Sequence, residues 1–544
     1  MFRRPYLLPS ALLLALTILF TWPQARYLGS RFAWHNDPQF SIWRLAWIAH
    51  ALGNDPRHLF DANIFHPNPR TLAYSDATLL EGLVAAPLLW AGIPTVAVYN
   101  LLLLGGIFAS GLGMFVLARH LTGSAGAALS AAAVFMMVPY RIEHYAHLEL
   151  QWAMWIPLAF WAFHRTVGER SWRLGPLTGL FLWLQVLSCV YYGVFLAITL
   201  GVLALLLIVV EPRRTATALP ALALGALLAA ALIYPYAAVY VGNIATVGPR
   251  DLAEIVRYSA QPTDYLATPP QNWWWSWTGA RWGSSELRLF PGAIAVCLAL
   301  VGVARRPARL VWAYLVVGAL AFELSLGPRG RVYAWLLDRV DLLHGLRAPG
   351  RMSIVAFCAL AMLAGFGVAA IEKRAGSRRG ARLAAGAALL LLTLEYASAP
   401  MVLTAANDRP LDVYKVMHGI GPGVVAELPM TTPDRLPGND AVYAYWSIGY
   451  WHPLVNGYSG HYPPDYFRLL ARMENFPDER SIATLVALDV RYVVVHRAYY
   501  APEEYRSLIF RIAERAELRS AGRYRDPLGD ADLFELKPQL ATSR

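Results

Sequence analysis

The nine residues from Phe32 to Phe40, with the sequence FAWHNDPQF, hold groups suited to acid–base chemistry. Asp37 lies in this stretch near His35, shortly after the first apolar run of the chain. A carboxylate within hydrogen-bond reach of a hydroxyl takes its proton as the hydroxyl attacks carbon. We therefore select Asp37 as the candidate catalytic residue, with His35 and Asp76 as candidate substrate-binding residues. The alternative is that Asp37 and Asp76 only cap helices, since aspartate is favoured at helix N-termini.

A second polar cluster occupies residues 139–151. His144 and His147, three residues apart, follow Glu143 and would be able to hold a metal ion if the segment is helical. Alternatively, the residues of this cluster contact substrate, and we count Glu143, His144, His147 and Glu149 as candidate substrate-binding residues. The simpler interpretation is that these groups hydrogen-bond to other loops at a membrane surface.

Two arginines flank a Pro-Gly turn, in the sequence Leu346-Arg347-Ala348-Pro349-Gly350-Arg351. The planar guanidinium group matches the oxygens of a phosphate. We therefore predict that Arg347 and Arg351 bind phosphate. Anchoring to lipid headgroups, or a simple turn at the start of a helix, is the alternative.

Aromatic residues mark two further candidate substrate contacts. Trp274 belongs to a tryptophan-rich segment at residues 261–283, and Tyr458 to the polar loop 456–462. Indole rings favour membrane interfaces, which alone explains most of the tryptophans. Stacking on a ring or chain of a substrate is the sharper hypothesis for Trp274, and contact with a substrate is the corresponding hypothesis for Tyr458.

The composition indicates a membrane protein. Of the 544 residues, 57% are hydrophobic and only 15% charged, where soluble proteins carry about a quarter. The net charge of +11 fits Lys and Arg retained in cytoplasmic loops better than binding to nucleic acid, which we do not expect as a partner. Cys189, Cys297 and Cys358 all lie in apolar runs, so no disulfide framework is predicted.

Apolar runs predict about eleven membrane-spanning helices, since a helix needs about 20 residues to cross. The runs are residues 6–24, 95–118, 124–140, 151–165, 175–190, 191–210, 216–240, 289–304, 308–326, 352–371 and 381–399. With the N-terminus inside and the first run read as an uncleaved anchor, the basic residues of the turns all fall on the cytoplasmic side, as the positive-inside rule requires. They are Arg3, Arg4, Arg119, Arg165, Arg170, Arg173, Arg213, Arg214, Arg305, Arg306, Arg309, Lys373, Arg374, Arg378, Arg379 and Arg382.

Two segments of the N-terminal region are predicted to lie at the membrane without crossing it. Residues 78–94 would invert the topology if they crossed, so we expect an interfacial or re-entrant helix there. Residues 40–52 predict an amphipathic helix on the membrane surface.

The tail from residue 400 changes character, because charged residues become frequent. Residues 424–428 and 491–496 predict buried strands, and residues 502–516 a helix. We therefore expect two domains: a transmembrane domain at 1–399 with a large first extracytoplasmic loop at 25–78, and an extracytoplasmic α/β domain at 400–544.

This layout resembles the GT-C glycosyltransferases. The resemblance rests on a first span followed by a large outer loop that opens with an acidic residue, then further spans and an α/β tail. It implies a polyprenyl-phosphate sugar donor and a catalytic or metal-binding role for Asp37. Many members carry two acids separated by one residue, whereas this chain has His35-Asn36-Asp37 with one acid, which leaves a requirement for Mg²⁺ or Mn²⁺ open. Arg-x-Pro-x-Arg at 347–351 also resembles a motif of related bacterial membrane proteins.

We therefore expect a hexosyl- or pentosyltransferase of a bacterial inner membrane. It would transfer a sugar, with inversion, from a polyprenyl phosphate to an extracytoplasmic glycan, lipid or protein of the cell envelope. The alternatives are a flippase or transporter of a lipid-linked saccharide and a non-catalytic assembly factor. A transporter would place ionisable groups within its spans, whereas the acids here gather outside them.

Overall fold

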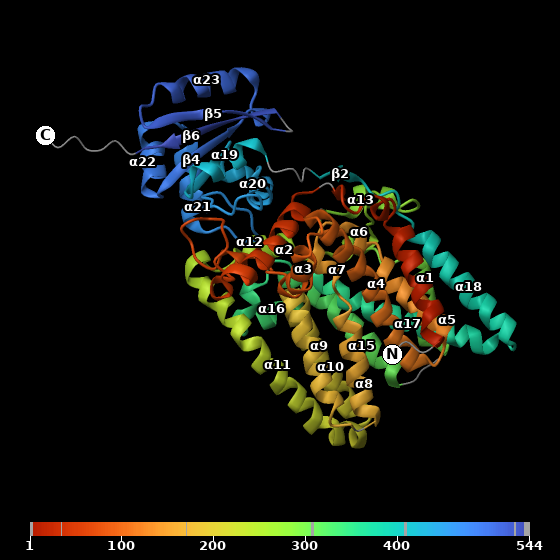
Figure 1. Ribbon diagram of the computed structural model, residues 1–544. Coiled ribbons are helices and arrows are strands. Elements are labelled where there is room, and N and C mark those ends of the chain that lie inside the picture. The colour runs from red at the N-terminus through yellow and green to blue at the C-terminus, as the bar shows by residue number, and fades with distance from the viewer. Residues whose placement is uncertain are drawn as a thin grey trace. The chain divides into compact units, whose positions relative to one another are not determined.

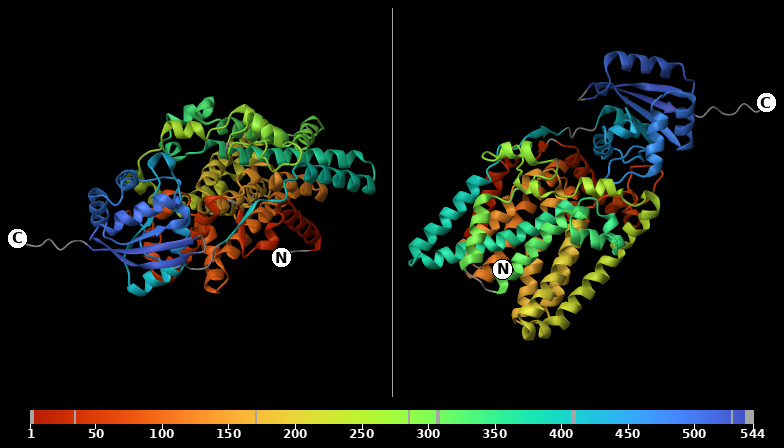
Figure 2. Two further views of the ribbon diagram at one scale, coloured as in Figure 1. Left: turned by 90° about the horizontal axis from the view of Figure 1, so that it is seen from above. Right: turned by 180° about the vertical axis from the view of Figure 1, so that it is seen from behind.

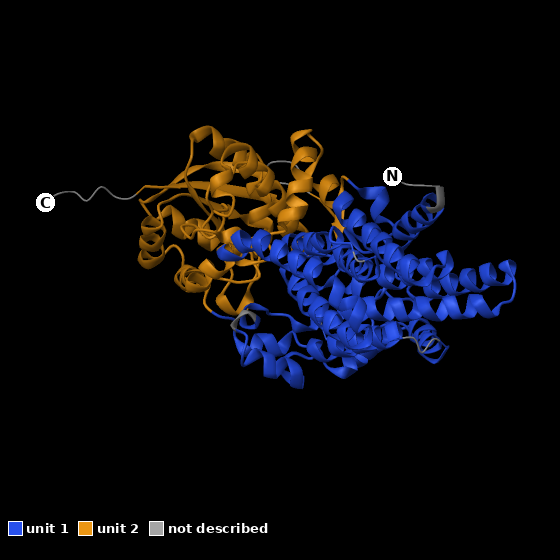
Figure 3. Ribbon diagram, turned by 90° about the horizontal axis from the view of Figure 1, so that it is seen from below, with its two compact units in different colours: residues 1–28, 100–238, 249–403 blue, residues 29–99, 239–248, 404–544 orange. Residues whose placement is uncertain are grey.

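The computed structural model describes residues 4–33, 35–169, 171–284, 286–305, 309–406, 411–526 and 529–537. Arg3, Arg170 and Arg306, which the topology prediction uses, lie outside these ranges. The chain divides into two compact units, coloured separately in Figure 3. The first unit comprises residues 1–28, 100–238 and 249–403, and the second comprises residues 29–99, 239–248 and 404–544. Residues 29–99 and the C-terminal tail therefore belong to one unit, although most of the apolar helices lie between them in sequence.

Helices make up nearly all of the regular structure in the first unit (Figure 1). Each of the apolar runs identified in the sequence forms a helix. The helices are α1 (Arg4–Phe20), α4 (Thr95–Thr122), α5 (Ala125–Met137), α6 (Tyr140–Glu143), α7 (Leu148–Gln151), α8 (Trp155–Glu169), α9 (Leu174–Ser188), α10 (Val190–Val210), α11 (Pro212–Val247), α12 (Leu252–Arg257), α13 (Ser276–Trp282), α14 (Ala293–Arg305), α15 (Arg309–Ser325), α16 (Arg331–Leu337), α17 (Ser353–Arg374) and α18 (Arg378–Glu395).

Within the described ranges, five helical segments are long and apolar enough to cross a membrane. They are Thr95–Thr122, Ala125–Glu143, Val190–Val210, Pro212–Val247 and Pro349–Arg374, and shorter apolar helices include Tyr6–Phe20, Leu174–Ser188 and Ala293–Arg305. An integral membrane protein is thereby supported. The count of about eleven crossings and the inside–outside assignment stay predictions.

Small residues allow the apolar helices to approach closely. A Cβ atom on Gly367 of α17 would collide with the carbonyl oxygen of Leu298 in α14, and one on Gly302 would collide with that of Leu363. Lipid gives little hydrophobic drive for one helix to join another, so close van der Waals packing at such positions is what holds membrane helices together. The α14–α17 pair therefore forms a rigid support for the loops at its ends.

The second unit contains the remaining elements. They are β1 (Arg31–Ala33), α2 (Asn36–Asn54), α3 (Leu79–Trp90), β2 (Leu403–Ala405), α19 (Asp412–Ile420), β3 (Val424–Leu428), α20 (Asp440–Ser447), α21 (Pro464–Met473), α22 (Glu479–Ala487), β4 (Val490–His496), α23 (Pro502–Ala513), β5 (Leu518–Asp526) and β6 (Gly529–Leu536). β3, β4 and α23 confirm the predicted strands and helix of the tail.

A four-stranded mixed sheet in the order β3-β4-β6-β5 forms the core of the tail. β3 and β4 run parallel, while β6 is antiparallel to both β4 and β5. Side chains alternate between the two faces of a strand. His496 meets Tyr414 of α19 on one face, while Asp532 accepts a hydrogen bond from Tyr505 of α23 on the other. The helices thus cover both faces of the sheet (Figure 2).

The helix α2 is not the surface helix that the sequence predicts. Both of its faces are largely buried, including Trp43 and Arg44, and it packs against α3 and α20. The Arg44 guanidinium donates to the carbonyl of Asp76, and the Trp43 indole donates to Asn63 over 3.1 Å. The apolar and polar side chains of α2 are therefore both buried against other parts of the protein, and not divided between a bilayer and water. The predicted helix within 78–94 is confirmed as α3, and its position relative to a membrane stays a prediction.

The burial of the Asp440 carboxyl group leads us to expect that the stability of the second unit depends on pH. It is 2% exposed, and its carboxylate accepts hydrogen bonds from Tyr466 (2.7 Å) and Asn456 (3.4 Å). Burial raises the pKa of Asp440 from 3.8 to about 7, although these hydrogen bonds act to lower it. The folded protein therefore holds a proton that the unfolded chain loses, so stability falls as the pH rises from about 4 to about 7.

Replacing Asp440 by Asn should flatten this dependence, because the amide carries no proton to lose. We expect the melting temperature of the wild type to drop more between pH 5 and pH 8 than that of Asp440→Asn. The exposed Asp412→Asn serves as the control and should behave as the wild type. Identical pH profiles for wild type and Asp440→Asn would contradict the assignment.

Candidate functional site

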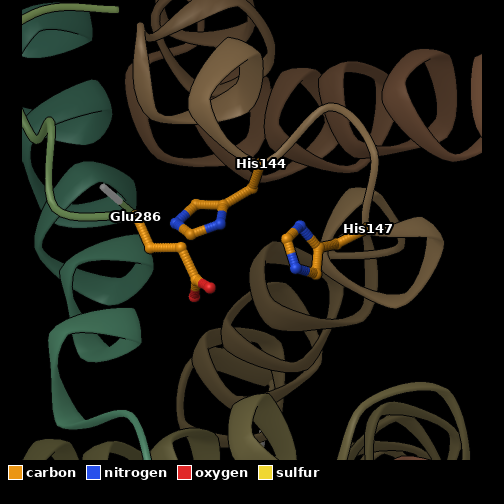
Figure 4. A group of neighbouring side chains, drawn as sticks. All are labelled: His144, His147 and Glu286. Atoms are coloured by element: carbon orange, nitrogen blue, oxygen red, sulfur yellow. The ribbon is translucent and has the colours of Figure 1, made fainter. Parts of the chain in front are cut away.

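Three side chains of the first unit converge on one point. The ring nitrogens of His144 and His147 and a carboxylate oxygen of Glu286 all lie within 4.8 Å of one another. The histidines come from the turn between α6 and α7, and Glu286 comes from the loop between α13 and α14. Figure 4 shows their polar atoms directed towards a common space. Two imidazoles and one carboxylate form a ligand set that can hold a metal ion.

Hydrogen bonds from side chains to backbone carbonyls hold the histidine turn in place. The side-chain amide of Gln151 donates to the carbonyls of Arg141 (3.1 Å) and His144 (2.7 Å). The guanidinium of Arg141 donates to the carbonyl of Leu150 over 2.9 Å, and the hydroxyl of Ser110 donates to that of Gln151 over 3.0 Å. The turn replaces the single helix assumed from the sequence, and it still brings both rings to one side.

His144 is suited to act as a ligand. It is 1% exposed, and its ring lies against the backbone and the carboxylate of Glu286. Burial, then the neighbouring His147 and Arg351, keep the pKa of His144 well below its usual value. The ring is therefore neutral at pH 7, which is the form that binds metals.

Glu286 has an unusual backbone for a residue with a side chain. Its φ angle is +66°, in the left-handed region that non-glycine residues seldom adopt. Its amide donates to Glu143 over 2.8 Å, and its carboxylate lies 3.3 Å from Arg351. Burial would raise the pKa of Glu286, but Arg351 and then His147 lower it to about 2. The carboxylate is therefore ionised throughout the physiological range.

Glu143 does not complete the histidine pair, contrary to the sequence-based hypothesis. Its carboxylate accepts from Arg288 over 3.0 and 3.2 Å and from the amide of Glu286. This ion pair orients the Glu286 loop. Glu286 itself was missed from the sequence, since its acidic side chain in a long loop gave no spacing signal.

The two predicted phosphate-binding arginines belong to the same network. Arg351 joins Glu286 and lies 5.2 Å from the ring centre of Tyr191, while the amide of Arg347 donates to the Tyr191 hydroxyl over 3.1 Å. The guanidinium of Arg347 lies 4.7 Å from the ring centre of Tyr258. The predicted pair is thus brought together in space around one tyrosine.

Arg250 and Glu254 extend this network and were not identified from the sequence. Glu254 lies 3.7 Å from Arg347 and 3.5 Å from Arg250. Three guanidinium groups, those of residues 250, 347 and 351, therefore lie among the carboxylates of Glu254 and Glu286, and the charge of Glu149 also acts on Arg351. Guanidinium groups gathered in this way suit an anion such as a phosphate.

Asp37 lies in the first turn of α2, in the second unit, and is not its N-cap. That position belongs to His35, whose Nδ1 lies 3.2 Å from the amide of Asp37 and 2.8 Å from its carboxylate. The Tyr458 hydroxyl donates to the other carboxylate oxygen over 2.7 Å. The neighbouring His35 and the distant Tyr458 thus orient the Asp37 carboxylate, which keeps 17% of its side-chain surface exposed.

The loop that carries Tyr458 is held by Asn456. Its side-chain oxygen accepts from the amide of Glu427 over 2.8 Å, and its amide group donates to the Glu427 carbonyl over 3.1 Å. The backbone carbonyl of Asn456 accepts from Phe65 of the first loop over 3.0 Å. Tyr458 therefore contacts the candidate base, where the sequence suggested only a contact with substrate.

The remaining candidates have different surroundings. Asp76 is buried, and its backbone carbonyl accepts the Arg44 hydrogen bond, while Glu149 is buried on α7. Trp274 is largely exposed, and its indole donates to the carbonyl of Leu394 over 2.7 Å. Its exposed ring agrees with an interfacial position, and stacking on a sugar stays a prediction.

The ligand set predicts selective loss of metal binding. Replacing His144 by Ala removes one of three donors, so the affinity for Zn²⁺ or Mn²⁺ should fall at least ten-fold, as measured by titration of the purified protein with the metal alone. Changes around metal ligands commonly cost 10- to 100-fold in affinity. The exposed His58→Ala is the matched control and should bind as the wild type does. Equal affinities for all three proteins would contradict the site.

Comparison with known proteins identifies the fold. No family model and no curated protein matches the sequence. Among solved structures, the mycobacterial arabinofuranosyltransferase AftD matches 99% of this chain at a TM-score of 0.60 and 16% identity. The chain spans 40% of the length of AftD.

The archaeal oligosaccharyltransferase AglB from Archaeoglobus fulgidus, solved with an inhibitory peptide and a dolichol-phosphate, also matches 99% of this chain. The TM-score is 0.52, the identity is 13%, and 75% of AglB is covered. An oligosaccharyltransferase structure from the same organism in complex with Zn and sulfate matches 96% of the chain at a TM-score of 0.51 and 13% identity, with 72% of that protein covered. The chain thus has a GT-C-like fold, as its sequence resemblance predicts.

Proposed function

We propose that this chain, with its GT-C-like fold, is a membrane glycosyltransferase. It transfers a sugar, with inversion, from a polyprenyl-phosphate-linked donor to an extracytoplasmic acceptor in a bacterial inner membrane. The observation that carries the proposal is the network in the first unit that joins three arginines to a metal-capable group. Charge of this kind suits the phosphate that leaves when a lipid-linked sugar is transferred. The likeness to AftD and to AglB, which was solved with a dolichol-phosphate, supports the donor class.

Asp37 is the proposed catalytic base. Sugar hydroxyls have pKa values far above 7, so attack on the anomeric carbon requires a carboxylate to take the proton as the bond forms. The hydrogen bond from Tyr458 fixes one carboxylate oxygen, and His35 lies against the other. Displacement in one step, with the acceptor oxygen entering opposite the phosphate, inverts the anomeric configuration.

Arg347 and Arg351 are the proposed phosphate ligands, with Arg250 as a third. As the bond between sugar and phosphate breaks, negative charge grows on the phosphate oxygens, and preorganised cations stabilise it. The aromatic rings of Tyr191 and Tyr258 support the guanidinium groups without neutralising them. The proposed acceptor is a glycan, a lipid or a protein, and the transfer assay described below distinguishes these three classes.

His144, His147 and Glu286 are the proposed ligands of a divalent cation. A bound cation would supply additional charge for the departing phosphate. Imidazole ligands suit Zn²⁺, whereas Mg²⁺ and Mn²⁺ prefer oxygen donors. The two histidines therefore favour Zn²⁺ over the two ions considered from the sequence.

A transfer assay tests the function directly. Purified wild type is incubated with a panel of radiolabelled polyprenyl-phosphate pentoses and hexoses and with candidate acceptors, with and without EDTA. We expect transfer from one donor class, with loss of activity in EDTA that Mn²⁺ or Zn²⁺ restores. Movement of intact labelled donor across proteoliposomes without any transfer would contradict the proposal and favour a transporter.

Replacing Asp37 by Asn should lower the transfer rate at least 100-fold, since general-base catalysis contributes about 10²- to 10⁴-fold. The amide keeps the size of the side chain and one oxygen that can accept from Tyr458, so donor binding should change little. Asp61→Asn, in the same loop, is the control and should remain active. Wild-type rates for Asp37→Asn would remove this residue from the chemistry.

Replacing Arg347 by Ala should raise the KM for the donor about ten-fold, because one charge-assisted contact to phosphate is lost. Arg339→Ala, at an exposed position of the same loop region, should leave the KM unchanged. Steady-state rates at varied donor concentration measure both. An unchanged KM for Arg347→Ala would show that this side chain does not contact the donor.

A further inference from the structure

A cavity of about 480 Å³ lies in the first unit, lined by parts of α1, α4, α8 and the turn after α4. Its walls include Tyr6, Arg119, His120, Trp161, Arg165 and Glu169. None of these residues belongs to the sites described above. The volume falls within the range of about 300–1,000 Å³ that ligand sites occupy.

The cavity carries an excess of cationic groups. Arg165 and Glu169 form a two-point ion pair at 2.6 and 2.7 Å, so the one carboxylate in the lining is already matched. Arg119 donates to the carbonyl of Gly123 and has no carboxylate partner among the described residues. The neighbouring imidazole of His120 adds a second donor. An anion entering the cavity therefore meets a guanidinium group whose charge is not yet neutralised.

The cavity lies at the end of a membrane-type helix. Arg119 and His120 occupy the last turn of α4, which is one of the five candidate spans. Tyr6 and Trp161 contribute aromatic walls, and such rings favour the boundary between membrane and water. The Tyr6 ring packs edge-on against Phe115 with 6.1 Å between ring centres, which ties α1 to α4 beside the cavity.

The helix α1, which contributes Tyr6 to the cavity, also carries exposed leucines. Leu7 and Leu8, next to Tyr6, are 57% and 78% exposed, and Leu14 and Leu19 further along are also exposed. A ligand with a phosphate at one end and acyl chains at the other would match both parts. Basic pockets between membrane helices are known to bind the headgroups of anionic lipids.

We infer that this cavity binds the phosphate of an anionic membrane phospholipid, with Arg119 and His120 as donors and the acyl chains along α1. The Arg165–Glu169 pair forms one wall and holds Trp161 in place, since the Arg165 guanidinium lies 5.0 Å from the Trp161 ring centre. The site is separate from the proposed transfer reaction and does not depend on it.

Native mass spectrometry of the full-length, delipidated protein tests this inference. Titration with dioleoylphosphatidylglycerol should show one tight site, with an affinity at least ten-fold above that for dioleoylphosphatidylcholine. The double variant Arg119→Ala/His120→Ala should reduce binding of phosphatidylglycerol at least ten-fold, to the level of phosphatidylcholine. Arg119→Gln alone, at an exposed position, should reduce it about five-fold, as expected for one charge near a lipid headgroup.

Arg382→Ala is the matched control, because Arg382 is an exposed arginine in the first turns of α18 and lies outside the cavity. It should bind phosphatidylglycerol as the wild type does. Size-exclusion profiles and melting curves verify that all variants are folded. Equal binding of the two lipids, equal loss in Arg382→Ala, or unchanged binding by Arg119→Gln would overturn the inference.

A competition arm separates lipid from free phosphate. Glycerol 3-phosphate and inorganic phosphate share the charged group but lack acyl chains. We expect neither to displace phosphatidylglycerol at concentrations 100-fold above that of the lipid. Displacement at concentrations equal to that of the lipid would show a site for a soluble phosphate and overturn the lipid assignment.

Discussion

The ion pair between Arg351 and Glu286 is the interaction on which the first-unit site depends. Arg351 is nearly buried at the start of α17, and a buried charge is costly unless another charge and hydrogen bonds compensate it. Glu286 supplies that charge from a separate loop, and the pairing keeps its carboxylate ionised beside His144 and His147. One contact therefore ties the arginine group to the histidine turn. Because of it, the proposed phosphate-binding arginines and the metal-capable group form a single electrostatic unit.

The surrounding structure makes that pair rigid. Close packing of α14 on α17 through glycines gives the loops at their ends a firm base. Gln151 and Arg141 tie the histidine turn to its own backbone carbonyls, and Arg288 with Glu143 holds the loop of Glu286. The left-handed backbone at Glu286 is sustained by these contacts. Residues in such conformations persist where neighbouring contacts hold them and are concentrated at functional sites.

In the second unit, hydrogen bonds position the loop that carries Tyr458 beside Asp37. Asn456 binds the backbone of β3 on one side and receives a hydrogen bond from the first loop on the other. Tyr458, two residues later, reaches Asp37. The C-terminal tail therefore contributes a side chain to the environment of the candidate base. The compact units accordingly group residues 29–99 with the tail, where the sequence suggests a simple boundary at residue 400.

The sequence by itself predicted the apolar helices, α3, α23, the strands β3 and β4, the resemblance to the GT-C fold and the candidate status of Asp37, Arg347, Arg351, His144 and His147. Apolar runs and strand patterns are local signals, so they predict elements reliably. Only the tertiary structure showed that Glu286, and not Glu143, joins the histidines, that Arg250 joins the arginines, and that Tyr458 contacts Asp37. It also showed α2 as a buried helix. Such pairings depend on contacts between residues up to hundreds of positions apart, and a single charged residue in a loop carries no local pattern that names its partner.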